Sequence, residues 1–180
     1  MGGKTTNLEY IYGRFMEHAK TDLVSIKTDG DRTIFFDFLP MDIGKVKGHD
    51  VKIQLYTVPG QVKYNATRRL VLKGVDGVVF VADSLVERKE RNIDSLKNLE
   101  ENLMMQNINI HNIPLVLQYN KRDLGSREAS LMSFETLEND LNSTLKVPSF
   151  MASAITGTNI VATLKKITAI TMTRLIASLS

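Results

Sequence analysis

The chain has 180 residues, of which 43% are hydrophobic and 24% are charged, and it contains no cysteine. This composition predicts one small domain over residues 1–180 and excludes disulfides and cysteine-based zinc sites. The net charge is +3 and the basic residues form no block, so we do not expect nucleic-acid binding. No stretch approaches the roughly 18 apolar residues of a membrane span, so we expect no stable membrane insertion. The lack of cysteine permits a cytoplasmic location.

The first half of the chain predicts a helix followed by two strands. Apolar residues recur at helical spacing after the first glycines and predict a helix over residues 4–18. Two segments, 34–39 and 51–58, are rich in β-branched and aromatic residues, and 42–50 between them carries turn formers. These two segments could form an antiparallel pair.

The second half alternates strand and helix patterns. Segments 77–82 and 114–119 are apolar almost throughout, which is typical of parallel strands covered by helices on both faces. Apolar stripes at helical spacing cover 93–103 and 160–175. The alternation predicts a three-layer α/β domain with a mostly parallel sheet, whose ligand site lies at the carboxyl ends of the strands.

The residues before the first helix match the last part of a phosphate-binding loop, and they are Gly2, Gly3, Lys4, Thr5 and Thr6. In such a loop, backbone N–H groups point at an anion, the lysine adds a positive charge and the hydroxyl of Thr5 can ligate magnesium. The full loop has another glycine earlier. We therefore expect the chain to begin inside the loop, with the first strand and the first half of the loop missing from it. A plain lysine-threonine helix start remains an alternative.

A second motif, NKRD, follows directly on the apolar strand that ends at residue 119. It supplies Asn120, Lys121 and Asp123. The Asp123 carboxylate can accept from the ring N–H and the exocyclic amine of guanine, whereas adenine presents an acceptor there, so GTP and GDP are favoured over ATP. Ser153 and Ala154 match the short element whose backbone N–H reaches the guanine oxygen. A solvated polar loop is the alternative interpretation of NKRD.

The segment TVPGQ at 57–61 ends the second strand of the expected antiparallel pair. A loop that senses the γ-phosphate would begin there. Gly60 can turn its N–H toward phosphate, and Gln61 is placed to orient an attacking water.

Two further candidates, Arg32 and Thr33, precede the first strand of that pair. Thr33 is the right type to complete magnesium coordination when a triphosphate is bound. Arg32 is a candidate arginine finger supplied in cis, although an ordinary exposed arginine explains it equally well. An ordinary exposed arginine is the simplest explanation for Arg68 and Arg69 as well, which follow the sensing loop.

Three stretches, TDGDRTIFFDFLP, LYTVPGQVKYNATRRLVLKGVDGVVFVADS and QYNKRDL, closely resemble the MglA-type bacterial small Ras-like GTPases of gliding motility and cell polarity. The resemblance implies a P-loop GTPase (Ras-like) fold, GTP or GDP with Mg²⁺ as cofactors, and intrinsic catalytic roles for Gln61 and Arg32. It also implies that switching slides the antiparallel strand pair and that a roadblock-type partner accelerates hydrolysis. Polarity or motility effectors and a position at the cell pole are implied as well.

In that family TVPGQ replaces the DxxGQ of most Ras-like proteins. Thr57 therefore stands where an aspartate would hold a magnesium-bound water, and its hydroxyl brings no charge. Two functions stay open. The first is a GTP-hydrolysing switch that controls gliding motility or cell polarity. The second is a degenerate or truncated GTPase-like scaffold that does not hydrolyse GTP, because the chain lacks the first loop glycine and the central first strand.

Overall fold

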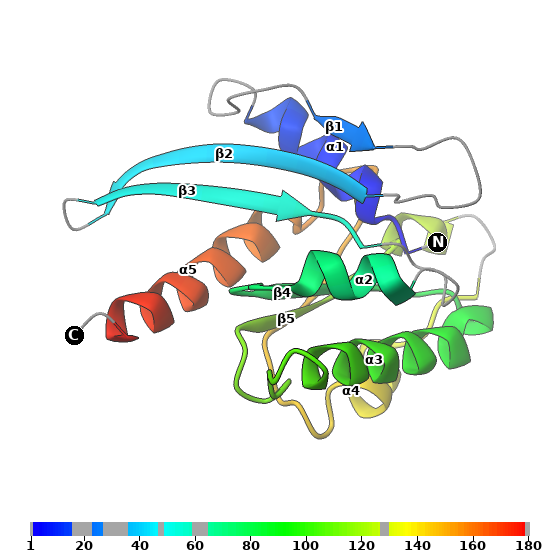
Figure 1. Ribbon diagram of the computed structural model, residues 1–180. Helices are drawn as coiled ribbons and strands as arrows, with labels where there is room; N and C mark the ends of the chain where they lie inside the picture. Colours follow the sequence, from blue (N-terminus) through cyan, green and yellow to red (C-terminus); the bar gives the residue numbers. More distant parts are fainter. Residues whose placement is uncertain are drawn as a thin grey trace.

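The computed structural model describes residues 2–15, 23–26, 36–46, 49–58, 65–126 and 130–178, and every structural statement below concerns these residues. Helices and strands follow the predicted alternation (Figure 1). The helices are α1 (Lys4–Arg14), α2 (Asn65–Leu72), α3 (Lys89–Met104), α4 (Phe134–Leu141) and α5 (Ile160–Ser178), with short 3₁₀ turns η3 (Val86–Arg88) and η4 (Arg122–Ser126). The strands are β1 (Val24–Ile26), β2 (Phe36–Val46), β3 (His49–Tyr56), β4 (Val78–Asp83), β5 (Leu115–Asn120) and β6 (Ser149–Met151).

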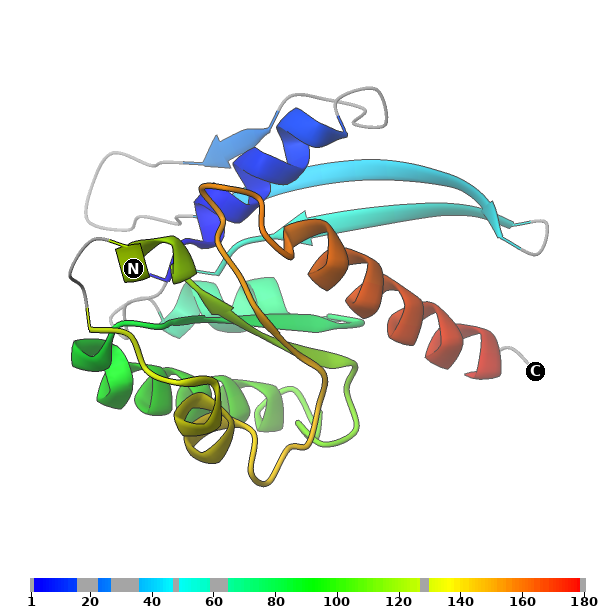
Figure 2. The ribbon, with the colours of Figure 1, turned by 180° about the vertical axis from the view of Figure 1, so that it is seen from behind.

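A parallel sheet, in the order β4-β5-β6, confirms the two strands predicted from apolar runs. Every residue of β5 is buried, because helices cover both faces of the strand. On one face Leu117 and Tyr119 belong to the larger core, which includes residues of α3 and α4. On the other face the side chain of Gln118 donates to the hydroxyl of Thr163 on α5 at 3.2 Å. Figure 2 shows α5 from behind the view of Figure 1.

The antiparallel sheet, in the order β1-β2-β3, confirms the predicted pair but differs from the prediction in two ways. The strand β1 adds a third member. The connection predicted over 42–50 is too long, because β2 continues to Val46 and β3 already begins at His49. Gly44 has φ +80°, its N–H donates to the Asp42 carboxylate at 3.0 Å, and the register shifts between these two residues. The glycine therefore forms a bulge within the strand.

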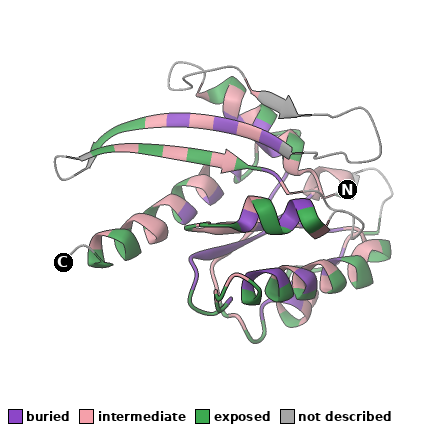
Figure 3. Ribbon diagram, in the orientation of Figure 1, coloured by how far each residue is buried: buried purple, intermediate pink, exposed green. Residues whose placement is uncertain are grey.

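The predicted helices are confirmed, with one earlier boundary. α1 ends at Arg14 and not at residue 18. The patterns over 93–103 and 160–175 lie in α3 and α5. α1 packs on β2 and on α5, and a second core forms there around Leu8 and Leu39. Buried and half-buried residues alternate along the first part of β2, as expected for a strand with one covered face (Figure 3).

A cavity of about 270 Å³ lies between the two sheets. β3 and β4 each stand at the edge of their sheet, and both line the cavity together with α1 and α5. Its walls include Leu8, Leu55, Val79 and Ile167. Among the described residues no strand joins the two sheets, so the single sheet of the predicted three-layer fold is interrupted here. Within the described part of the chain, no helix is both long and apolar enough to cross a membrane.

Candidate functional site

The start of α1 lies at the carboxyl ends of β4 and β5. Gly3 caps the helix with φ +88°, and its carbonyl accepts from the side-chain amide of Asn7 at 2.9 Å. A Cβ on Gly3 would collide with the side-chain nitrogen of Asn120, and a Cβ on Gly2 would lie 2.7 Å from the carbonyl oxygen of Val81. Both positions therefore need glycine for close approach as well as, at Gly3, for the left-handed backbone. Thr6 is half-buried in the first turn of α1.

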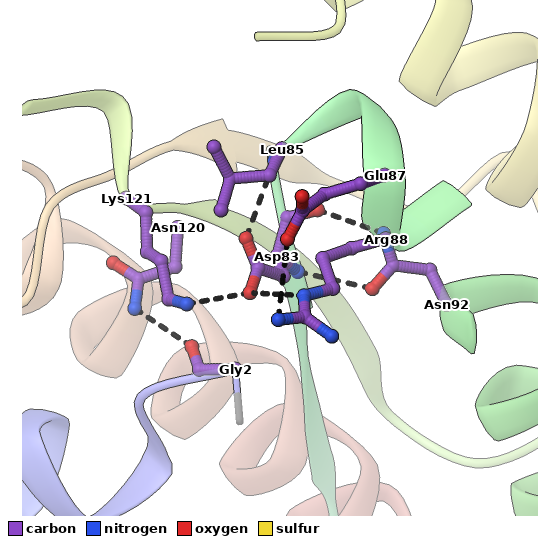
Figure 4. A network of polar contacts seen from close by, with 8 residues as sticks. All are labelled: Gly2, Asp83, Leu85, Glu87, Arg88, Asn92, Asn120 and Lys121. Atoms are coloured by element: carbon purple, nitrogen blue, oxygen red, sulfur yellow. Dashed lines mark hydrogen bonds and ion pairs between the residues drawn. The ribbon is translucent and has the colours of Figure 1, made fainter. Parts of the chain in front are cut away.

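Asn120 at the end of β5 joins three separate segments. Its amide nitrogen donates to the carbonyl of Gly2 at 2.8 Å (Figure 4). Its amide oxygen accepts from the backbone N–H of Ala154 at 2.8 Å. The side chain is buried. One amide thus fixes the first loop against β5 and against the loop after β6. The N–H of Ala154, predicted to reach a guanine oxygen, is donated to Asn120 in this structure.

The carboxylate of Asp123 is held by a neighbouring hydroxyl. The Oγ of Ser153 donates to Oδ1 of Asp123 at 2.6 Å, and it accepts from the N–H of Thr156 at 3.2 Å. Ser153 is buried while Asp123 is half-exposed. The sequence alone gave Ser153 little weight, but the structure shows that it orients the carboxylate.

The loop after β6 also packs against α1. Gly157 has φ +80°, and a Cβ there would overlap the ring of Tyr10. The loop that carries Ser153 and Ala154 is therefore fixed from the α1 side as well as from β5.

Lys4 and Arg68 place two positive charges where α1 begins. Burial lowers the pKa of Lys4 below its ordinary value, the charge of Arg68 lowers it further, and the nearby Asp37 opposes both effects. The prediction of an exposed Arg68 is wrong, because the residue is only 5% exposed and its guanidinium donates to the side-chain oxygen of Asn98 on α3. Two neighbouring, mutually repelling cations favour an anionic ligand at this point.

Asp37 on β2 supplies a negative charge that the sequence analysis did not find. Its Oδ2 accepts from the hydroxyl of Thr5 at 2.7 Å and from the hydroxyl of Thr57 at 2.9 Å. The backbone N–H of Thr57 donates to the carbonyl of Asp37 at 2.9 Å. Thr57 brings no charge itself, but a buried carboxylate from the adjacent strand touches it. The one available signal was a lone carboxylate in the apolar segment FFDFLP.

Two comparisons with known proteins agree with this geometry. The sequence pattern of the ADP-ribosylation factor family matches residues 18–171. The "Mutual gliding-motility protein MglA" of Myxococcus xanthus (strain DK1622) is 48% identical over 173 residues, which cover 96% of this chain and 86% of that protein. The chain belongs to the MglA-type small GTPases. The Ras-like GTPase fold is thereby confirmed, and guanine nucleotides are the ligand class of this family.

The donor groups near the start of α1 fit the Mg²⁺ that small GTPases commonly use. Mg²⁺ prefers hard oxygen ligands and is usually held by one or two carboxylates together with water and substrate phosphates. Thr5 and Thr57 offer hydroxyl oxygens, and Asp37 offers a carboxylate in contact with both. No group of three or more His, Cys, Asp or Glu residues that could hold a metal exists in the described part of this MglA-type GTPase.

Four predicted site residues, Arg32, Thr33, Gly60 and Gln61, lie outside the described residues. Gly60, Gln61 and Arg32 were assigned to the γ-phosphate or to hydrolysis, and Thr33 was assigned to magnesium coordination. The base-binding candidates of this MglA-type GTPase and the last part of its phosphate loop are all described, and they converge at the carboxyl edge of the parallel sheet.

Proposed function

We propose that this chain is a GTP-binding and GTP-hydrolysing molecular switch that controls gliding motility or cell polarity. The observation that carries the proposal is the double role of Asn120, whose amide links the start of the phosphate loop to the loop after β6. A ligand with a base at one end and phosphates at the other matches the two loops that Asn120 joins. The motility role follows from the name of the relative, a mutual gliding-motility protein.

The base end of the site favours guanine. Asp123 can accept from the ring N–H and the exocyclic amine of guanine, and Ser153 holds one of its oxygens in place. A preorganised acceptor loses less free energy on binding than one that must first be ordered. Adenine would place a lone pair against this carboxylate, so ATP is disfavoured.

The phosphate end favours a nucleotide with bound Mg²⁺. Lys4 and Arg68 would neutralise phosphate charge, while Thr5, supported by Asp37, would face the metal. A metal held there would supply positive charge against the negative charge that develops on the phosphates during hydrolysis. By resemblance, Thr33 completes this coordination, Gln61 orients the attacking water, Gly60 contacts the γ-phosphate and Arg32 stabilises the transferred group.

Switching requires partners that distinguish the GTP form from the GDP form. We propose a roadblock-type GTPase-activating protein and polarity or motility effectors as these partners, and a cytoplasmic protein that gathers at the cell pole. Loss of the γ-phosphate would release the loops that contact it and change the surface that partners bind.

The binding proposal is tested by titrating the purified chain with a fluorescent analogue of GDP in the presence of Mg²⁺. Unlabelled GDP and GTP should displace the analogue, and ATP at the same concentrations should not. Displacement by ATP, or no binding at all, would contradict guanine recognition.

Hydrolysis is tested by phosphate release from GTP in single turnover. Gln61→Leu and Arg32→Ala should each slow hydrolysis while leaving GDP affinity nearly unchanged, because neither residue is assigned to the base. Tight GTP binding without phosphate release would instead support the non-hydrolysing scaffold.

A further inference from the structure

We propose that Asp83 is a positioning residue for the nucleotide, and that it acts by holding the ammonium of Lys121 so that the stem of Lys121 lies against the face of the guanine ring. The inference rests on the proposed function, since it concerns the same base site. Neither the NKRD motif nor the comparisons assign a role to Asp83.

Asp83 is the last residue of β4 and is fixed on several sides (Figure 4). Its side chain is 5% exposed, and its Oδ2 accepts from the Nζ of Lys121 at 2.5 Å. Its Oδ1 accepts from the N–H of Leu85 at 3.2 Å. The side chain of Asn92 on α3 clamps the backbone of Asp83 through two hydrogen bonds, of 3.0 and 2.8 Å. The carboxylate therefore occupies one defined position.

Lys121 is constrained at both of its ends. Its backbone has φ +72°, which places a non-glycine residue in the left-handed region that such residues rarely adopt. Its ammonium is bound to Asp83, while 27% of the side chain remains exposed. The apolar stem thus runs from the NKRD loop to the end of β4. Stems of this kind cover apolar surfaces while the charged end stays paired or in water, so this stem can serve as a platform for a purine ring.

A second cation, Arg88, makes the Asp83 carboxylate more important for the position of Lys121. The Nε of Arg88 lies 4.0 Å from Oδ2 of Asp83, and its Nη2 pairs with Glu87 at 3.2 Å. Without the Asp83 charge, Lys121 and Arg88 would repel each other, and the Lys121 ammonium would leave its position. Glu87 is mostly exposed and touches the same arginine without touching Lys121, so it offers a matched control.

The test is a double-mutant cycle on GDP affinity with Asp83→Asn and Lys121→Met. Asp83→Asn keeps the size of the side chain, and Lys121→Met keeps an apolar stem without the charge. We expect Asp83→Asn to weaken GDP binding about tenfold, which is the size of one charge-assisted hydrogen bond. In the Lys121→Met background the same substitution should change GDP affinity little, because its effect passes through the lysine.

Three further measurements separate positioning from general destabilisation. Glu87→Gln should leave GDP affinity unchanged. Asp83→Asn should leave the ratio of GDP to inosine diphosphate affinities unchanged, because the stem meets the ring face and not the edge that Asp123 reads. The midpoint of thermal unfolding of each variant shows whether the protein is folded at the assay temperature.

Equal losses of affinity from Asp83→Asn in both Lys121 backgrounds would overturn the proposal, as would an altered ratio of GDP to inosine diphosphate affinities. A lower unfolding midpoint of Asp83→Asn with unchanged GDP affinity would also overturn the proposal. If the unmodified chain does not bind GDP, the proposed function fails and this inference fails with it. If the unmodified chain binds GDP and the cycle shows no coupling, only the role of Asp83 fails.

Discussion

The base side and the phosphate side of the site are held together in different ways. On the base side, comprising residues 120–123 and 153–157, polar groups find partners within the fold. The carboxylate of Asp123 pairs with Ser153, and the amide of Asn120 bonds at both its nitrogen and its oxygen. On the phosphate side, at the start of α1, burial and the charge of Arg68 lower the pKa of Lys4, and the nearby carboxylate of Asp37 opposes both effects.

This difference shows which part of the nucleotide site folding alone can assemble. The base side is assembled by hydrogen bonds that need no ligand, so it is ready to select a base. On the phosphate side, Arg68 lies close enough to lower the pKa of Lys4, so an anion that neutralises both cations should raise stability. Nucleotide binding should therefore stabilise the phosphate side more than the base side.

The largest expected effect concerns the packing of the base side on α1. Gly157→Ala forces a left-handed alanine and places its Cβ into the ring of Tyr10, so the free energy of unfolding should fall by about 3 kcal/mol. Gly74→Ala is the matched control, because φ is +72° there but nothing lies within 4 Å of an added Cβ. It should cost about 1 kcal/mol. Urea unfolding of both variants measures the difference, and equal losses would show that Tyr10 does not fix the loop.

A smaller effect concerns the carboxylate of the phosphate side. Asp37→Asn removes the charge that meets Thr5 and Thr57, so the affinity for GDP in the presence of Mg²⁺ should fall by about 2 kcal/mol. In the presence of a chelator the variant and the unmodified chain should release GDP at similar rates. Asp42→Asn makes the same change farther along β2 and should leave release unchanged. The same Mg²⁺ dependence in Asp37→Asn as in the unmodified chain would contradict the role of Asp37.

The smallest expected effect concerns the positive charge of Lys4 beside Arg68. Lys4→Met removes a buried ammonium that Arg68 repels, so the nucleotide-free protein should gain about 1 kcal/mol of stability while its nucleotide affinity falls. Because the pKa of Lys4 is lowered in the folded state, the unfolded chain binds more protons between that value and 10.5. In that window the contribution of Lys4 makes the free energy of unfolding rise with pH.

Denaturant titrations of both proteins across this pH range measure the difference. The rise of the free energy of unfolding with pH should be smaller in Lys4→Met than in the unmodified chain. Destabilisation of the nucleotide-free protein by Lys4→Met would mean that Lys4 is a structural residue and not a group kept for the ligand.

The sequence predicted best those features that depend on short-range patterns. The apolar runs of β4 and β5, the helical stripes of α3 and α5, and the NKRD loop are all short-range patterns, and the structure places them as expected. The connection predicted over 42–50 was too long because a glycine favours a turn and a strand bulge by the same backbone freedom.

The residues that the sequence analysis missed act across distance. Asp37 meets Thr5 and Thr57 from another strand, Arg68 is buried through its contact with Asn98, and Asp83 reaches Lys121 from the neighbouring strand. Each of them is an ordinary charged residue in its own segment. Each of these three residues gains its partner only through the pairing of strands or the packing of α2 on α3. No local sequence pattern encodes these long-range contacts.

The account depends most on the claim that Asp123 selects guanine, and one measurement tests it directly. Xanthine carries a carbonyl where guanine carries its exocyclic amine, so an asparagine amide can donate to xanthine where a carboxylate cannot. In parallel titrations, Asp123→Asn should bind GDP about a hundredfold more weakly than the unmodified chain and should prefer xanthosine diphosphate over GDP. Unchanged GDP affinity in Asp123→Asn, or equal weakening toward both nucleotides, would contradict base recognition by this loop.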